Sequence, residues 1–106
     1  MRLGVLFFVL LLAGCTASVN EPVISSPDIV IESFSFVPES LNVSVGGSVT
    51  WLNSDGAVHT IVADDGSFSS GVLNDGDSYS FTFNSPGTVS YHCSVHPSMR
   101  GVIVVD

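Results

Sequence analysis

Short stretches of alternating hydrophobic and polar residues cover most of the chain after residue 28. Residues 41–45 and 49–51 alternate in this way, and residues 79–83 repeat the period of two with aromatic side chains. This pattern predicts β-strands with one buried face. Residues 101–105 form a nearly continuous apolar run, which predicts a final strand within a hydrophobic environment.

Turn-forming dipeptides separate these stretches. Gly46-Gly47 suits a two-residue hairpin between the runs at 41–45 and 49–51, and Asp75-Gly76 and Pro86-Gly87 mark later reversals. No stretch has the period of an amphipathic helix. Many short strands with turn signals roughly every ten residues predict one all-β domain, a sandwich or a barrel.

The N-terminus has the features of an export signal. Met1-Arg2 is followed by an apolar run from Leu3 to Leu12, and Leu12-Ala13-Gly14-Cys15 resembles a lipobox, in which the Cys is lipid-modified after cleavage. We therefore predict a signal peptide at residues 1–14 and lipidation at Cys15. The alternative is an ordinary cleaved signal with an incidental Cys. Either reading predicts an exported protein, periplasmic or at the cell surface.

Residues 15–27 mix small, polar and proline residues without a hydrophobic period. This composition is typical of a flexible tether. The domain itself is expected to span residues 28–106, attached to the membrane only through lipid on Cys15.

The segment from Tyr91 to Met99 places a thiol, an imidazole and a thioether at equal steps, as Cys93, His96 and Met99. Soft sulfur ligands select copper over hard cations, and two imidazoles, one thiolate and a weak axial Met form a blue-copper site. His59 is the candidate for the second imidazole. If Cys15 carries lipid, Cys93 is the only free thiol of the mature chain, and a bound metal would protect it in an oxidising compartment.

Four segments, at residues 34–38, 49–53, 59–62 and 93–99, resemble the cupredoxins of the plastocyanin and amicyanin group. The resemblance covers residues 28–106. It implies a Greek-key β-sandwich of about eight strands that holds one type 1 copper ion. By the family pattern His59, Cys93 and His96 are the equatorial ligands and Met99 is the axial ligand.

The chain departs from that pattern beside two ligands. Thr60 stands where such proteins usually have Asn, and we expect the hydroxyls of Thr60 and Ser94 to replace part of the link that this Asn makes. Val95 stands where they usually have Pro. Its amide either points at the Cys93 sulfur and stabilises the reduced site, or Val95 only adds apolar surface beside His96. Asn53 completes the set of residues expected around the ligands.

Several other residues are expected to be structural. Strand alternation points His92 away from the face that carries Cys93, so we expect it to lie outside the metal site. Trp51 and the Phe residues are predicted to form the core. Asn42-Val43-Ser44 matches the glycosylation pattern, but this sequon is a weak signal because it lies within a regular strand alternation.

The small number of histidines limits the function classes. A copper enzyme needs a further metal site with an open position for substrate, and the chain has only three histidines, two of them already assigned. A binding lipoprotein with an immunoglobulin-like sandwich has no need of the Cys, His and Met cluster. We therefore expect a non-enzymatic carrier of single electrons, with a copper storage or delivery lipoprotein as the alternative.

Charge bears on the partners. The chain has a formal net charge of −8, and removal of residues 1–14 takes away Arg2 and lowers it by one, to −9. This disfavours nucleic acid and anionic membrane surfaces and favours redox proteins with a basic docking surface. Solubility in a salty habitat explains the acidity equally well. We expect a monomer that docks through an apolar surface of His96, Pro97 and residues 56–58.

Overall fold

The structure is a computed structural model that describes residues 26–106, and the predicted signal peptide and Cys15 lie outside that range. The described residues form eight strands: β1 (Ile29–Glu32), β2 (Ser35–Val37), β3 (Ser40–Val43), β4 (Ser48–Asn53), β5 (Val62–Ala63), β6 (Ser78–Thr82), β7 (Gly87–His92) and β8 (Arg100–Val105). Within this range there is no helix with the length and apolar character needed to cross a membrane.

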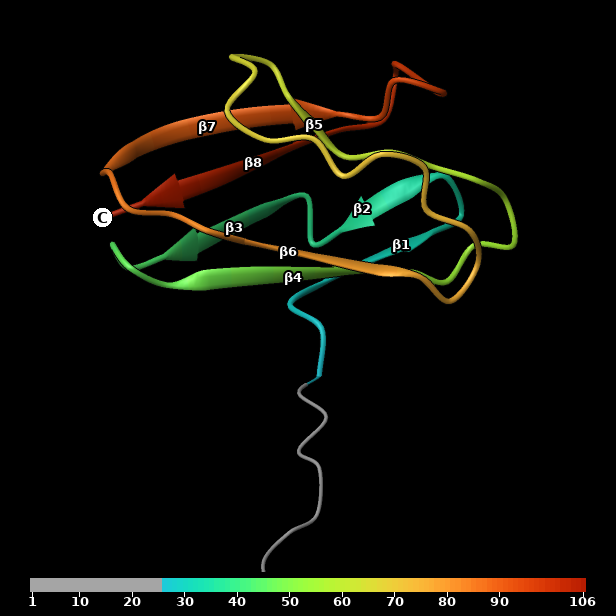
Figure 1. The fold of residues 1–106 in the computed structure, drawn as a ribbon, viewed down its shortest axis with the longest axis horizontal. Helices are drawn as coiled ribbons and strands as arrows, with labels where there is room; N and C mark the ends of the chain where they lie inside the picture. The colour runs from blue at the N-terminus through green and yellow to red at the C-terminus, as the bar shows by residue number, and fades with distance from the viewer. Residues whose placement is uncertain (1–25) are drawn as a thin grey trace, which may run out of the picture.

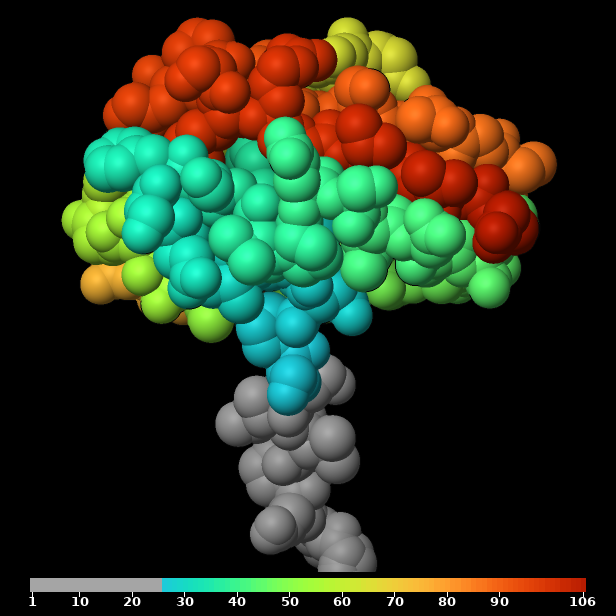
Figure 2. Space-filling model, turned by 180° about the vertical axis from the view of Figure 1, so that it is seen from behind, coloured from blue at the N-terminus to red at the C-terminus, as the bar shows by residue number. Residues whose placement is uncertain are grey.

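The strands form two four-stranded sheets that face each other (Figure 1). One sheet has the order β2-β1-β4-β6 and the other β3-β8-β7-β5. The pairs β1–β4 and β3–β8 are parallel, while the remaining pairs are antiparallel. Figure 2 shows β3 beside the end of β8 on the surface. The all-β sandwich expected from the alternation is confirmed.

The hairpin predicted at Gly46-Gly47 is wrong. Strands β3 and β4 lie in different sheets, so the turn between them passes from one layer to the other. Its backbone is fixed by both layers, because the amide of Val45 donates to Asp106 and that of Gly46 donates to Phe83. Gly46 has a positive φ of 90°, which explains the glycine. This φ does not distinguish an arch, which joins strands of different sheets, from a hairpin, which joins neighbours in one sheet.

Aromatic side chains fill the space between the sheets. Trp51 and Tyr91 are fully buried and meet edge to face, with ring centroids 5.5 Å apart. Phe68 lies in the segment between β5 and β6, and its ring centroid is 5.8 Å from that of Trp51. Such pairs contribute about 0.5–1.5 kcal/mol beyond their burial. They join the two sheets directly beneath the end of β7 that leads to Cys93.

Gly101 allows the Tyr91 ring to lie against β8. A Cβ at this position would overlap the ring carbons and the hydroxyl of Tyr91. Neighbouring strands pair Tyr91 with Gly101, so the overlap cannot be relieved by a small side-chain rotation. The glycine is required here by close approach and not by an unusual φ.

We predict that Gly101→Ala lowers the free energy of unfolding by about 1–3 kcal/mol, because overpacking forces the buried Tyr91 ring or β8 to move. Urea denaturation measures the change. Ser90→Ala, on the neighbouring strand, serves as the control. An unchanged midpoint for Gly101→Ala would show that the core tolerates the added methyl group.

Candidate metal centre

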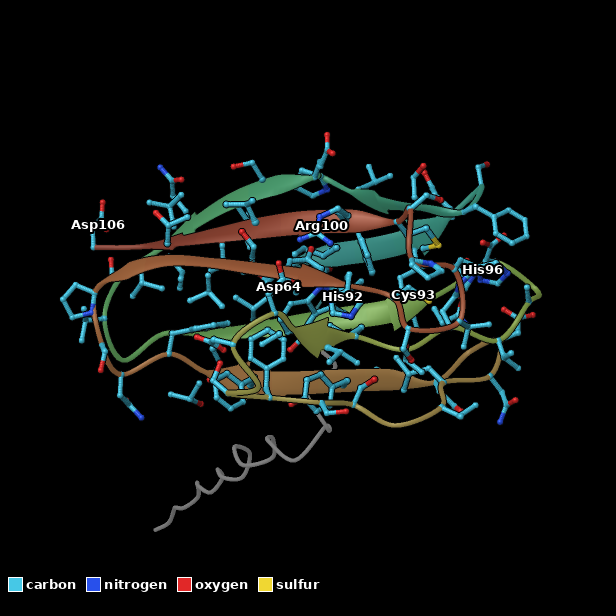
Figure 3. All side chains as sticks on the ribbon, turned by 90° about the horizontal axis from the view of Figure 1, so that it is seen from above. Asp64, His92, Cys93, His96, Arg100 and Asp106 are labelled. Atoms are coloured by element: carbon cyan, nitrogen blue, oxygen red, sulfur yellow. The ribbon has the colours of Figure 1, made fainter. Side chains whose placement is uncertain are left out.

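Two loops bring candidate ligands together at one end of the sandwich. His59 follows β4, while Cys93 and His96 lie between β7 and β8. One ligand atom from each of these three residues lies within 4.8 Å of the others. Figure 3 shows Cys93 and His96 at the end of the molecule opposite Asp106. Three of the four ligands that the sequence selected therefore converge.

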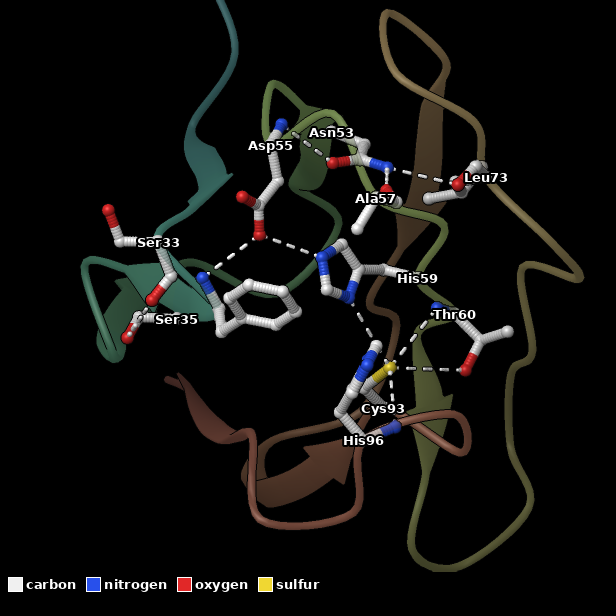
Figure 4. Close-up of polar contacts among 11 residues, drawn as sticks. Ser33, Ser35, Asn53, Asp55, Ala57, His59, Thr60, Leu73, Cys93 and His96 are labelled. Atoms are coloured by element: carbon white, nitrogen blue, oxygen red, sulfur yellow. Dashed lines mark hydrogen bonds and ion pairs between the residues drawn. The ribbon is translucent and has the colours of Figure 1, made fainter.

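The sulfur of Cys93 is fully buried and accepts hydrogen bonds from both loops. The amides of Thr60 and His96 each donate to Sγ at 3.4 Å (Figure 4). Burial disfavours the thiolate, but the hydrogen bonds from the amides of Thr60 and His96 outweigh it and lower the pKa of Cys93 to about 6. The site thus favours the charged sulfur, which is the form that binds metals.

His59 is held by a carboxylate that the sequence analysis did not identify. Its Nε2 lies 2.8 Å from Oδ2 of Asp55. A carboxylate only accepts hydrogen bonds, so Nε2 carries the proton and Nδ1 presents its lone pair. Nδ1 lies 3.8 Å from the Cys93 sulfur, on the side where a metal would bind. Asp55 thereby selects the tautomer and orientation of the ring.

Asp55 also holds the turn between β1 and β2. The amide of Phe34 donates to the same oxygen, Oδ2, at 2.9 Å. This hydrogen bond, followed by that from His59, lowers the pKa of Asp55 against the opposing effect of burial. Ser33 and Phe34 both have positive φ, a conformation that costs energy for residues other than glycine. The carboxylate stabilises this turn beside the site.

Asn53 fixes the loop that carries Asp55 and His59. Its buried side chain donates to the carbonyls of Ala57 at 2.8 Å and Leu73 at 3.0 Å and accepts from the amide of Asp55. Leu73 and His59 in turn form a two-way backbone bridge. Asn53 was expected near the ligands, and its contacts show that it shapes their loop.

Thr60 and Ser94 join the two ligand loops, as the sequence predicted. The two hydroxyl oxygens lie 2.7 Å apart, and the Ser94 amide donates to Oγ1 of Thr60 at 2.7 Å. Of the two possibilities for Val95, the structure does not show the one in which its amide points at the sulfur: within residues 26–106 the amide of this loop that reaches the sulfur belongs to His96. Val95 is 44% exposed, which agrees with the alternative of added apolar surface.

Met99 lies directly under the loop. Its side chain is buried, its amide donates to the carbonyl of His96 at 2.9 Å, and its carbonyl accepts from the amide of Cys93 at 3.1 Å. These backbone hydrogen bonds close a tight turn through Cys93, His96 and Met99, which are three residues apart. The turn holds Cys93, His96 and Met99 within one short, hydrogen-bonded loop.

His92 lies outside the cluster, as strand alternation predicted. Its Nδ1 is 2.6 Å from Oδ1 of Asp64, whose other oxygen accepts a hydrogen bond from Arg100. The hydrogen bond from His92, with a smaller contribution from Arg100, lowers the pKa of Asp64. His92 precedes Cys93 and Arg100 follows Met99, so one carboxylate binds both sides of the ligand loop.

Phe34 is not a core residue, contrary to the prediction made for the Phe residues as a group. It is 51% exposed. Its ring meets His96 edge to face at 5.0 Å and His59 at 5.4 Å. In the sequence Phe34 alternates in step with Phe36, which is buried, so the pattern alone suggests a buried ring. The positive φ of the turn instead accompanies a ring that lies outward over the imidazoles.

The donor set fits a copper ion. His96 Nδ1 is buried and has no hydrogen-bond partner among the described residues, which is costly unless the nitrogen binds something else. Two imidazoles and a thiolate converge, and a thioether lies in the same loop. Soft sulfur donors with imidazole suit copper, whereas the hard cations prefer oxygen.

Comparisons with known proteins agree with this fit. The family profile described as copper binding proteins, plastocyanin/azurin family, matches residues 25–106. Amicyanin-alpha of Methylorubrum extorquens is 31% identical over 91% of this chain and 85% of its own length. Among solved structures, a purple cupredoxin from Nitrosopumilus maritimus is 30% identical with a TM-score of 0.71, over 76% of this chain and all of that chain. A Cu(I) form of an amicyanin variant is 33% identical with a TM-score of 0.71, over 81% and 87%.

We predict that Asp55→Ala weakens copper binding by roughly 10–100-fold, because His59 loses the partner that fixes its tautomer and orientation. Competition with a chelator of known affinity measures the change. Asp65→Ala is the control, since Asp65 receives hydrogen bonds only within its own turn, from Ser67. Equal affinities for the Asp55 variant and the wild type would remove Asp55 from the site.

Proposed function

Because the chain belongs to the plastocyanin/azurin family of copper-binding proteins, we propose that it carries single electrons between redox partners by cycling one copper ion between Cu(I) and Cu(II). The observation that supports this most is the convergence of His59, Cys93 and His96 within 4.8 Å on two hydrogen-bonded loops. A rigid donor set of this kind suits electron transfer, since little must move when the charge changes.

In this proposal His59 and His96 would hold copper through imidazole nitrogens, Cys93 through its thiolate, and Met99 more weakly through its thioether. Copper supplies the one-electron redox chemistry. The chain supplies the rest: Asp55 orients His59, the Thr60 and His96 amides stabilise the sulfur charge, and the aromatic core excludes water from below.

Electrons would pass through the exposed surface around His96. Phe34, Val58 and Val95 are 51%, 42% and 44% exposed, and Pro97 is also exposed. Together with His96 they form an apolar patch to which a partner can dock closely, excluding water between the two redox centres. The negative net charge outside this patch favours a partner with a basic docking surface.

A catalytic role is not part of the proposal. The chain has three histidines, and His92 is engaged with Asp64 on the outside of the sheet. Storage or delivery of copper remains the second candidate. The buried, fully surrounded Cys93 argues against it, because metal transfer to another protein needs accessible ligands.

The copper assignment predicts a specific spectrum. The wild type loaded with Cu(II) should show an intense visible charge-transfer band that Cys93→Ser abolishes, because the thiolate carries the transition. Met99→Leu should keep the band and shift the reduction potential. Visible and paramagnetic resonance spectra during copper titration make the test.

His92→Gln is the matched control for His96→Gln. The first should retain the blue centre and the second should lose high-affinity copper, because only His96 belongs to the cluster. A protein that binds copper without the visible band would favour the storage function. Retention of the band in Cys93→Ser would refute the ligand assignment.

We also propose that the protein is exported and attached to the membrane through lipid on Cys15. The lipobox-like segment at residues 12–15 and the tether at residues 16–27 support this. A lipid anchor would keep the carrier near membrane-bound partners and leave the domain free to turn.

Expression in a bacterial host should place the full chain in the membrane fraction, with a mass increased by lipid at Cys15. Cys15→Ser is expected to release it from the membrane, because no acyl chain is attached. Cell fractionation and mass spectrometry check both outcomes. Export of the wild type as an unmodified soluble protein would favour the ordinary cleaved signal.

A further inference from the structure

The hydroxyl of Thr60 lies between the second ligand loop and the Cys93 sulfur. Its Oγ1 is 2.7 Å from the Ser94 amide nitrogen, 2.7 Å from Ser94 Oγ and 3.8 Å from Cys93 Sγ. Thr60 is 6% exposed, whereas Ser94 is exposed to solvent. Water therefore offers Ser94 another partner, while Thr60 must satisfy its hydroxyl within this group of atoms.

The hydrogen-bonding capacity of a hydroxyl matches these three neighbours. A hydroxyl has one donor and two acceptor positions. The Ser94 amide can only donate, so it occupies one acceptor position of Thr60 Oγ1. Ser94 Oγ and the sulfur then compete for the Thr60 proton. A thiolate is the stronger acceptor, because hydrogen bonds to a charged atom are about twice as strong as those between neutral groups.

We propose that the Thr60 hydroxyl donates a third hydrogen bond to the Cys93 sulfur, with the amide and hydroxyl of Ser94 both donating to Thr60 Oγ1. The inference rests on the proposed copper function. Thr60 then reaches one sulfur through both its backbone amide and its side chain. Ser94 sets the direction of the Thr60 proton and does not itself touch the sulfur.

The functional consequence is a higher reduction potential. The sulfur keeps more negative charge in the Cu(I) state, so an additional donor stabilises that state more than the Cu(II) state. Thr60 is thus a positioning residue that tunes the potential through the ligand Cys93. The side chain that replaces the usual Asn would both join the loops and act on the sulfur.

Thr60→Val tests the donor, because Val keeps the shape of Thr and removes the hydroxyl. We expect the Cu(II)/Cu(I) equilibrium to shift about tenfold toward Cu(II), which lowers the potential by about 59 mV. Thr60→Ser should restore the wild-type value. Protein-film voltammetry measures the potential, and the visible band shows that each variant still holds copper in the blue site.

Ser94→Ala distinguishes the two directions of the Thr60–Ser94 hydrogen bond. In the proposed arrangement the Thr60 proton already points at the sulfur, so the potential stays close to the wild-type value. In the opposite arrangement the Thr60 proton loses Ser94 Oγ as its acceptor and turns to the sulfur, and the potential rises. Ser98→Ala, at an exposed hydroxyl of the same loop, is the control.

Vibrational spectra give a readout that does not depend on folding of the Thr60 variant. Exchange from H₂O to D₂O should shift the Cu–S stretching frequencies equally in the wild type and in Ser94→Ala. A larger shift in Ser94→Ala than in the wild type, or no shift in either, overturns the inference. So does a potential of Thr60→Val equal to the wild-type value in a protein with the visible band. Absence of that band from the wild type would instead refute the proposed function.

Discussion

The buried sulfur of Cys93 is the constraint to which both ligand loops are adapted. A thiolate without solvent contact costs several kcal/mol unless hydrogen bonds or a cation compensate it. Here the Thr60 amide comes from one loop and the His96 amide from the other, each at 3.4 Å. Both loops must therefore keep their conformation for the sulfur to remain charged. The same requirement makes the site rigid, which is the property that rapid electron transfer needs.

Three side chains outside the ligand set maintain this arrangement, and each one joins separate segments. Asn53 holds its own loop to Leu73, and Asp55 joins that loop to the β1–β2 turn and to His59. Asp64 binds His92 and Arg100, on the two sides of the ligand loop. The exposed Asp64 interactions contribute little to overall stability, as is usual for surface ion pairs. Their effect is local, on the positions of the ends of the loop.

The sequence predicted the parts of the molecule that depend on short-range pattern. Alternation identified β3, β4, β6 and β8 and placed Cys93 inward and His92 outward, and equal spacing identified His96 as a member of the cluster. It failed where long-range contacts decide. Gly46-Gly47 fits a hairpin or an arch equally well, and only the pairing of β3 with β8 selects the arch.

The same limit applies around the metal centre. The outward position of Phe34 depends on two residues with positive φ that are stabilised by Asp55, 21 positions later in the chain. Asp55 and His59 are only four residues apart, but in an irregular loop this spacing does not predict that the two side chains meet. Val95, unlike Pro, has an amide that can donate a hydrogen bond. The path of the turn, which the sequence does not show, directs the next amide, that of His96, to the sulfur.

X-ray absorption spectroscopy of the copper edge in both oxidation states is the decisive test of the assigned ligand set, because it reports the ligands of the metal before and after electron transfer. We expect two nitrogen neighbours and one short sulfur neighbour in Cu(II) and in Cu(I) at neutral pH, with nearly the same distances. Loss of an imidazole on reduction, or a first shell without the short sulfur contact, would contradict this ligand set.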